Sequence, residues 1–121
     1  MTEENDSNVP NQLEKNLLWL GYEEYTGLWQ VVIEVSDETE PETGESQRDL
    51  ARNLIQKLLD RGWIEIYLSD GPLGDGKIML IPLEERQNFL DSERSWNLDE
   101  EDEQSVWFAT TDEGITAYRR R

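Results

Sequence analysis

The order of expected helices and strands in this chain of 121 residues predicts an α+β fold, a small antiparallel sheet of about three strands packed against three to four helices. One observation is the amphipathic pattern of residues 46–61, which is followed directly by the strand-like sequence WIEIYL. Another is a later strand-like sequence, SVWFAT, that leads into a C-terminal helical pattern. Five Trp, four Tyr and two Phe supply enough apolar surface for one small core.

The sequence of the N-terminal half predicts a tail followed by two helices. Residues 1–12 lack apolar periodicity, so we expect a disordered acidic tail there, followed by a single domain at 13–121. Apolar residues recur at helical spacing from Leu13 to Val35, and Gly21 predicts a break before a second helix that starts near Tyr25. The β-branched run at 31–33 leaves a strand open as an alternative. The sequence that follows predicts an acidic loop at 36–45.

The C-terminal half begins with the helix at 46–61. Ser46 and Asp49 are typical of a helix start, and Gly62 of a helix end. One face of this helix is apolar: Leu50, Leu54, Ile55, Leu58 and Leu59.

Strands are expected at 63–68 and 77–81, joined as a hairpin by the turn sequence SDGPLGDG. Pro82 predicts the start of a helix that ends near Asp91. An acidic loop at 97–104 and a strand at 105–110 follow, and Thr111 is expected to cap a last helix from Asp112 to about Arg120, with Ile115 and Tyr118 facing inward.

The charge balance limits the classes of partner. The chain has 28 Asp and Glu against 11 Lys and Arg, a net charge of −17, and its basic cluster, Arg119 to Arg121, is too short to offset that charge. Nucleic acids and anionic membranes need cations that neutralise phosphate, so we expect neither as a partner. A basic protein would be attracted instead. We also expect a cytoplasmic protein, because the N-terminus is acidic and polar, unlike a signal peptide, and no run is apolar enough to span a bilayer.

The catalytic and metal-binding residue types are sparse. The chain has no His and no Cys, so acid–base chemistry would fall to carboxylates, Lys or Tyr, and no carboxylate pair stands out. Asp70 and Asp75 lie near glycines without the spacing of a calcium loop, and LGDGK lacks the spacing of a phosphate-binding loop. We therefore expect no enzyme, no cofactor and no dedicated metal site.

The two acidic loops are candidates for binding a partner, although such loops are also common as solvated segments that aid solubility. Most of the five tryptophans are expected in the core, with Trp19 or Trp96 exposed beside a loop. The candidate partner-binding residues are Glu34, Asp37, Glu38, Glu40, Glu42, Glu45, Asp99, Glu100, Glu101, Asp102 and Glu103, with Trp96 as an aromatic anchor.

Two stretches, LARNLIQKLLDRGWIEIYLSD and VWFATTDEGITAYRRR, resemble the winged-helix pattern over residues 46–118. The matching positions are a helix that turns at Gly62 into a strand and a closing Phe108, Thr111, Gly114 step into a helix. The same features are similar to those of a set of small bacterial proteins of unknown function. The pattern departs from DNA-reading members, since the helix has a charge-balanced polar face and the wing sequence has acidic residues but no basic one.

Two functional hypotheses follow. The first is a non-catalytic acidic protein that neutralises a basic toxin or nuclease-like protein, as an immunity protein, an antitoxin-like inhibitor or a mimic of nucleic acid does. The alternative is a winged-helix-type regulator or scaffold that acts through protein contacts without direct DNA binding, and a homodimer would be compatible with that role.

Overall fold

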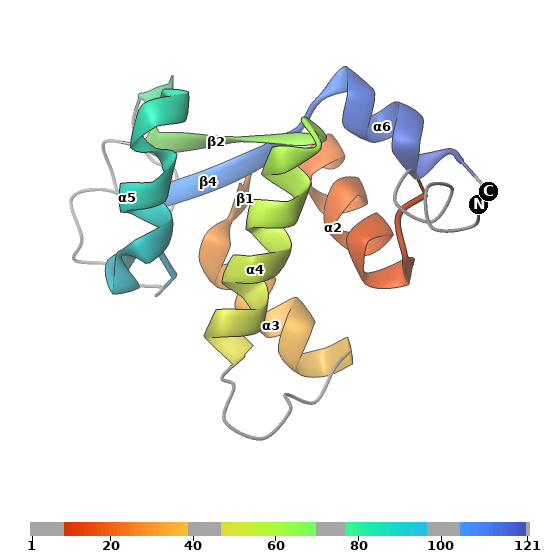
Figure 1. The fold of residues 1–121 in the computed structure, drawn as a ribbon, viewed down its shortest axis with the longest axis horizontal. Coiled ribbons are helices and arrows are strands. Elements are labelled where there is room, and N and C mark those ends of the chain that lie inside the picture. The colour runs from red at the N-terminus through yellow and green to blue at the C-terminus, as the bar shows by residue number, and fades with distance from the viewer. Residues whose placement is uncertain (1–8, 39–46, 70–76, 97–104, 121) are drawn as a thin grey trace.

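The computed structural model describes residues 9–38, 47–69, 77–96 and 105–120. Within these ranges it has five α-helices, two short 3-10 helices and four strands in one antiparallel sheet, which confirms the α+β fold. In Figure 1, α4 lies in the centre, α5 on one side, and α2 and α6 on the other.

The first helix of the described residues, α2 (Gln12–Glu23), begins at a cap that was not predicted from the sequence. Asn11 Oδ1 accepts the backbone N–H of Glu14, and Glu14 Oε1 accepts the backbone N–H of Asn11, each at 2.8 Å. This reciprocal capping box fixes the start of the helix. The expected disordered tail is therefore too long, because residues 9–12 belong to the described body; residues 1–8 lie outside it.

The break expected near Gly21 is confirmed, because α2 ends at Glu23 and α3 starts at Leu28, although Gly21 itself lies inside α2. A Cβ atom at this position would lie 2.7 Å from both Phe108 Cε2 and Thr110 Oγ1. The glycine therefore lets α2 approach β4 (Ser105–Thr110) closely. Thr110 Oγ1 strengthens this contact by donating a hydrogen bond to the carbonyl of Leu18 at 2.7 Å.

The chain leaves α2 through a strand of two residues, β1 (Thr26–Gly27), and enters α3 (Leu28–Glu38). The second expected helix is confirmed, and the strand alternative at 31–33 is not observed. Helix α3 continues through residues 36–38, which had been assigned to the acidic loop, and residues 39–46 lie outside the described part of the chain.

The amphipathic helix is confirmed as α4 (Gln47–Asp60). Gly62 has a φ of 74°, a left-handed conformation that glycine adopts without strain, and it turns the chain into β2 (Ile64–Ser69). Two hydrogen bonds join this turn to Thr111, near the C-terminus. Thr111 Oγ1 donates to the carbonyl of Gly62 at 2.7 Å, and the Thr111 backbone N–H donates to the carbonyl of Trp63 at 2.9 Å.

The strand order in the sheet is β1-β4-β2-β3. Strand β3 (Ile78–Leu80) pairs with β2, which confirms the expected hairpin. Strand β4 inserts between β1 and β2, with Ile66 opposite Phe108 and Gly27 opposite Trp107. Four strands are thus observed where about three were expected, because β1 is too short to give a sequence pattern.

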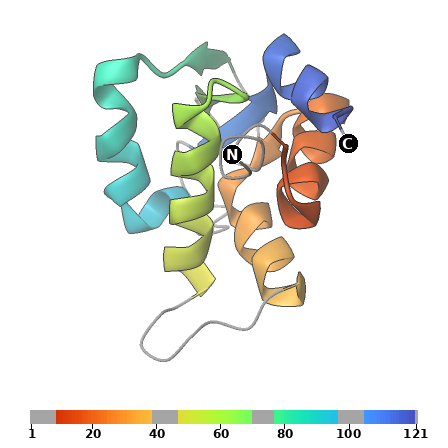
Figure 2. The same cartoon turned by 45° about the vertical axis from the view of Figure 1, so that its right-hand side comes forward.

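Two short helical segments follow β3: the 3-10 turn η2 (Leu83–Glu85) and α5 (Arg86–Asp91). A further 3-10 segment, η3 (Glu93–Trp96), ends this part of the described chain. The closing helix, α6 (Asp112–Tyr118), has Thr111 as its N-cap, as expected, with Thr111 Oγ1 accepting the backbone N–H of Gly114 at 3.0 Å. Figure 2 shows α5 and α6 on opposite sides of α4.

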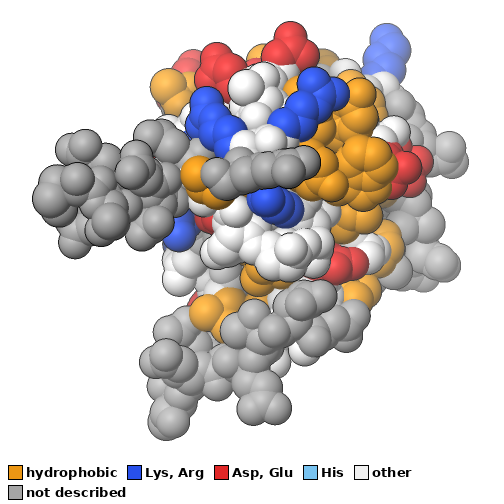
Figure 3. Space-filling view, turned by 90° about the vertical axis from the view of Figure 1, so that its right-hand side faces the viewer, with side chains coloured by type: hydrophobic (Ala, Val, Ile, Leu, Met, Phe, Trp, Pro, Cys, Tyr) orange, Lys and Arg blue, Asp and Glu red, His pale blue; other side chains and the backbone are white. Residues whose placement is uncertain are grey.

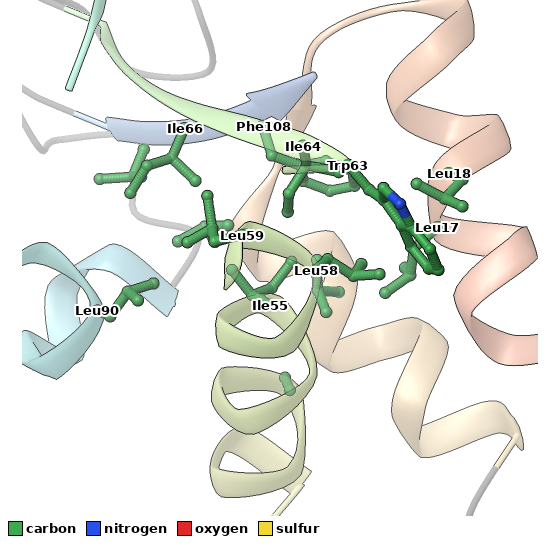
Figure 4. Close-up of a cluster of buried hydrophobic side chains, with 14 of the residues drawn as sticks. Leu17, Leu18, Ile55, Leu58, Leu59, Trp63, Ile64, Ile66, Leu90 and Phe108 are labelled. Atoms are coloured by element: carbon green, nitrogen blue, oxygen red, sulfur yellow. The ribbon is translucent and has the colours of Figure 1, made fainter. Parts of the chain in front are cut away.

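The core lies between the sheet and the helices. Figure 4 shows Ile64, Ile66 and Phe108 of the sheet pointing toward helical side chains that include Leu17, Ile55 and Leu58. All six are at most 1% exposed. Residues from both halves of the sequence share this one core, so the described body folds as a unit.

Candidate functional site

The acidic side chains proposed for partner binding are largely outside the described part of the chain. Glu34 is a half-buried residue of α3, and Asp37 and Glu38 form the end of that helix, but their side chains are not described. The remaining acidic candidates lie outside the described residues: Glu40, Glu42, Glu45, Asp99, Glu100, Glu101, Asp102 and Glu103.

Trp96 is buried, so the expectation that it acts as an exposed aromatic anchor is wrong. Its side chain is 4% exposed, and its Nε1 donates a hydrogen bond to the carbonyl of Leu90 at 2.9 Å. This bond satisfies the polar atom of the indole, and the ring, which extends from η3, packs in the hydrophobic core. Trp63 and Trp107 are also buried, as expected for most of the tryptophans.

The exposed tryptophan is Trp19, the other residue named from the sequence. It is 42% exposed, and its ring lies 5.7 Å from that of Tyr118, with an angle of 27° between the planes. Tyr22, one turn further along α2 and 51% exposed, lies 5.7 Å from Trp19 on another side. The three rings form an aromatic patch over α2 and α6. Figure 3 shows the face that carries these helices, where hydrophobic side chains gather with cationic and acidic side chains around them.

A groove of about 210 Å³ adjoins the aromatic patch, and we call it the α2–α3 groove. Trp19 and Tyr118 line it together with Lys15 of α2 and Glu34 of α3. Glu34 Oε1 accepts a hydrogen bond of 3.4 Å from Gln30 Nε2. One of the candidate carboxylates is therefore beside an exposed tryptophan, although not beside the tryptophan that the sequence analysis chose.

The sequence contained a signal for this surface. Lys15, Trp19 and Tyr22 are spaced i, i+4 and i+7, so they share one face of α2. Leu17, Leu18 and Gly21 are buried on the other side of the helix. Helix α2 thus has one apolar face in the core and a second, aromatic face on the surface that begins at Lys15. A second apolar face of this kind is typical of a helix that binds a partner.

Other hollows occur in the described body. A cavity of about 240 Å³ lies between α2, α3 and α4 and is mostly apolar, with Leu13, Val35 and Leu54 in its walls. A cavity of about 580 Å³ has charged side chains of both signs, among them Glu65, Arg86, Asp112 and Glu113. Arg86 Nε is buried there without a hydrogen-bond partner among the described residues.

The cations of α4 are used in ion pairs within the protein. Arg48 pairs with Glu93 at 3.0 Å, and Arg52 pairs with Asp91, so these two arginines join α4 to the α5–η3 segment. Hydrogen bonds from the Arg52 guanidinium, and then from Gln87, hold the pKa of Asp91 below its usual value.

The other end of α4 is joined to α2 through a buried carboxylate. Glu14 is 2% exposed, and its Oε2 lies 3.3 Å from Arg61 Nη1 and 3.7 Å from Lys57 Nζ. The Arg61 guanidinium also lies 4.8 Å from the centre of the Trp63 ring. Both cations therefore act within the fold.

A second exposed aromatic contact lies near the sheet. Tyr25 meets Tyr67 edge to face, with 5.1 Å between ring centres, and Tyr25 is 46% exposed. Partial burial, followed by the charge of Glu65 and the neighbouring Tyr25, raises the pKa of Tyr67.

In the described part of the chain, no group of three or more His, Cys, Asp or Glu side chains is arranged to hold a metal ion. None of the helices described there is both long and apolar enough to cross a bilayer. Comparisons of the chain with protein-family models, with curated proteins and with solved structures found no match.

Proposed function

We propose that this protein is a non-catalytic acidic binding protein that neutralises a basic partner protein, in the manner of an immunity protein, an antitoxin-like inhibitor or a mimic of nucleic acid. The observation that carries the proposal is the uneven placement of charge along the chain. The segments 1–8, 39–46, 70–76 and 97–104 contain thirteen of the 28 acidic residues and no Lys or Arg. These residues are Glu3, Glu4, Asp6, Glu40, Glu42, Glu45, Asp70, Asp75, Asp99, Glu100, Glu101, Asp102 and Glu103.

The ion pairs of the body support the same proposal. Arg48, Arg52, Lys57 and Arg61 each lie within 4 Å of a carboxylate in α2, α5 or η3. These cations are engaged within the fold, so they are poorly placed to neutralise the acidic segments as well. The negative field of those segments would then speed association with a cationic surface, by about 10- to 1,000-fold at low salt.

The mechanism we propose is electrostatic occlusion. Carboxylates of the acidic segments cover the cationic face of the partner, where the phosphates of a nucleic acid would otherwise bind. Affinity of this kind weakens steeply with ionic strength, because salt screens charges separated by more than about 8 Å at physiological concentration.

The test is capture of partner proteins at 50 mM and 300 mM NaCl with two matched variants. One variant neutralises Asp99–Glu103 with five Asn and Gln substitutions. The control removes five exposed carboxylates from the described body: Glu23, Glu24, Glu84, Glu85 and Glu113. We expect a captured protein of high isoelectric point that is released by salt, lost with the first variant and retained by the control. Equal capture by both variants, or capture of no basic protein at low salt, would contradict the proposal.

A second candidate function is a winged-helix-type regulator or scaffold that acts through protein contacts. The favouring observation is that the two stretches carrying the resemblance pack on each other: α4 turns at Gly62 into β2, β2 pairs with β4, and Thr111 of the second stretch bonds to Gly62 and Trp63. The exposed aromatic patch would supply the protein contact. Its test is formation of a protein complex that depends on Trp19 and persists at 300 mM NaCl, where binding by the acidic segments would be weak. Loss of the complex at that salt concentration, or its retention in W19L, would contradict this role.

A further inference from the structure

The α2–α3 groove combines the two features that recognise a cationic side chain. Trp19 is 42% exposed and stacks at 5.7 Å on the half-buried Tyr118, and the negative face of an aromatic ring attracts ammonium and guanidinium groups. Glu34, in the wall of the same groove, supplies a carboxylate.

The groove wall has one charged side chain of each sign, Glu34 and Lys15. Lys15 lines the groove as a cation and opposes the effect of Glu34. Neutralisation of Glu34 should therefore weaken binding of a cation in the groove, and neutralisation of Lys15 should strengthen it. An anionic ligand should show the opposite changes.

We propose that an arginine or lysine side chain of the basic partner enters this groove, with its charged group against Trp19 and Tyr118 and paired with Glu34. The inference rests on the proposed function and adds a specific anchor to it. An aromatic and acidic groove would give register and orientation to a complex whose association is otherwise directed by diffuse charge.

The overall charge favours a cationic occupant over the alternatives. A second copy would bring another net charge of −17 to the interface, and a nucleic acid would bring phosphates toward Glu34 and the rest of an acidic molecule. Either alternative would have to overcome electrostatic repulsion. A basic segment is instead attracted by the negative charge of the protein.

The experiment is a chemical-shift titration of ¹⁵N-labelled full-length protein with a hexa-arginine peptide at 50 mM NaCl. The amides of Asn16 and residue 34 report on the groove separately from the acidic segments. Four variants are compared with the wild type: E34Q, W19L, K15Q and E84Q. E84Q is the matched control, because it makes the same charge change as E34Q at an exposed residue that does not line the groove.

We expect E34Q and W19L each to weaken binding at the groove by about two- to fivefold, the range that exposed ion pairs and cation–π contacts produce. K15Q should tighten it by about twofold, and E84Q should stay close to the wild type. Circular dichroism checks folding, which we expect to be retained because Trp19 and Glu34 are not core residues.

The outcomes separate the groove from the proposed function. If hexa-arginine binds but leaves the groove amides unchanged, or if E34Q behaves like E84Q, the groove inference is wrong and the proposed function stands. If hexa-arginine does not bind at all, both are wrong. If hexaglutamate binds more tightly than hexa-arginine, and K15Q weakens hexaglutamate binding, the groove is an anion site instead. Sedimentation equilibrium that detects a dimer in the wild type but not in W19L would show a second copy as the occupant. Either result would overturn the inference.

Discussion

Replacement of the buried carboxylate of Glu14 should destabilise the protein more than replacement of either of its cationic partners. Glu14 has two structural roles: its Oε1 accepts the Asn11 backbone N–H at 2.8 Å, and its Oε2 pairs with Arg61 and Lys57. Truncation to Ala removes both roles. Conversion to Gln keeps an acceptor for the Asn11 N–H and removes the charge.

The magnitude follows from these contacts. Loss of a helix cap costs about 0.5–2 kcal/mol, and hydrogen bonds to charged groups contribute about 1.5–3 kcal/mol. Removing one partner of a fully buried ion pair costs about 3–5 kcal/mol, but Lys57 is 53% exposed and Arg61 21% exposed, so both cations regain water and the cost is smaller. We therefore expect about 2.5 kcal/mol for E14A, about 1–1.5 kcal/mol for E14Q and less than about 0.5 kcal/mol for K57A.

The assay is urea unfolding followed by circular dichroism and tryptophan fluorescence. With a denaturant slope of about 1.5 kcal/mol/M, E14A should lower the midpoint by about 1.7 M without a change in slope. If E14Q unfolds at the wild-type midpoint, the ion pairs to Arg61 and Lys57 contribute nothing to stability, and the account of how α2 is joined to α4 is wrong.

Three further substitutions test other parts of the structure. G62A should cost about 1–2 kcal/mol in urea unfolding, because Ala would have to adopt the left-handed backbone that Gly62 has at a φ of 74°; an unchanged midpoint would refute this. W96F should cost about 1–3 kcal/mol because it leaves the buried carbonyl of Leu90 without its donor, and it should leave binding of a basic partner unaltered, which a binding assay on the folded variant would check. D91N should lower stability at neutral pH, since Arg52 holds the pKa of Asp91 below its usual value in the folded state. That stabilisation is present above the unfolded pKa of about 3.9 and is lost as the pH falls through the lower folded value, so unfolding curves of D91N and wild type should converge in that window; a difference independent of pH would contradict this cause.

The elements predicted correctly from the sequence are those whose signals are local. Helix α4, the turn at Gly62 and the Thr111 cap of α6 each depend on residues within a few positions of one another. The packing role of Gly21 was not predicted because it is non-local: the glycine leaves space for Phe108, which is 87 positions away in the chain. Strand β1 was missed because two residues carry no periodicity, and its pairing is decided by the approach of β4.

The candidate site was predicted less well, for a physical reason. Trp96 stands beside an acidic stretch in the sequence, which suggested an exposed ring, but the burial of an indole depends on a partner for its N–H, and Leu90 supplies one six residues earlier. Glu14 was given no role from the sequence, although its N-x-x-E spacing from Asn11 is a capping signal. Trp19 could have been assigned to the surface from its spacing with Lys15.

The placement of charge connects the fold with the proposed function. High net charge opposes compaction through self-repulsion, yet the α4 helix has favourable ion pairs on both flanks, with Glu14 on one side and with Asp91 and Glu93 on the other. The body thus uses four of its cations, Arg48, Arg52, Lys57 and Arg61, to join α4 to neighbouring helical segments. The acidic residues of 39–46 and 97–104 have no Lys or Arg within their own segments. A cationic partner would relieve the repulsion among them. Binding and stability are therefore linked: a basic ligand that prefers the folded state should raise the free energy of unfolding as its concentration rises above its dissociation constant.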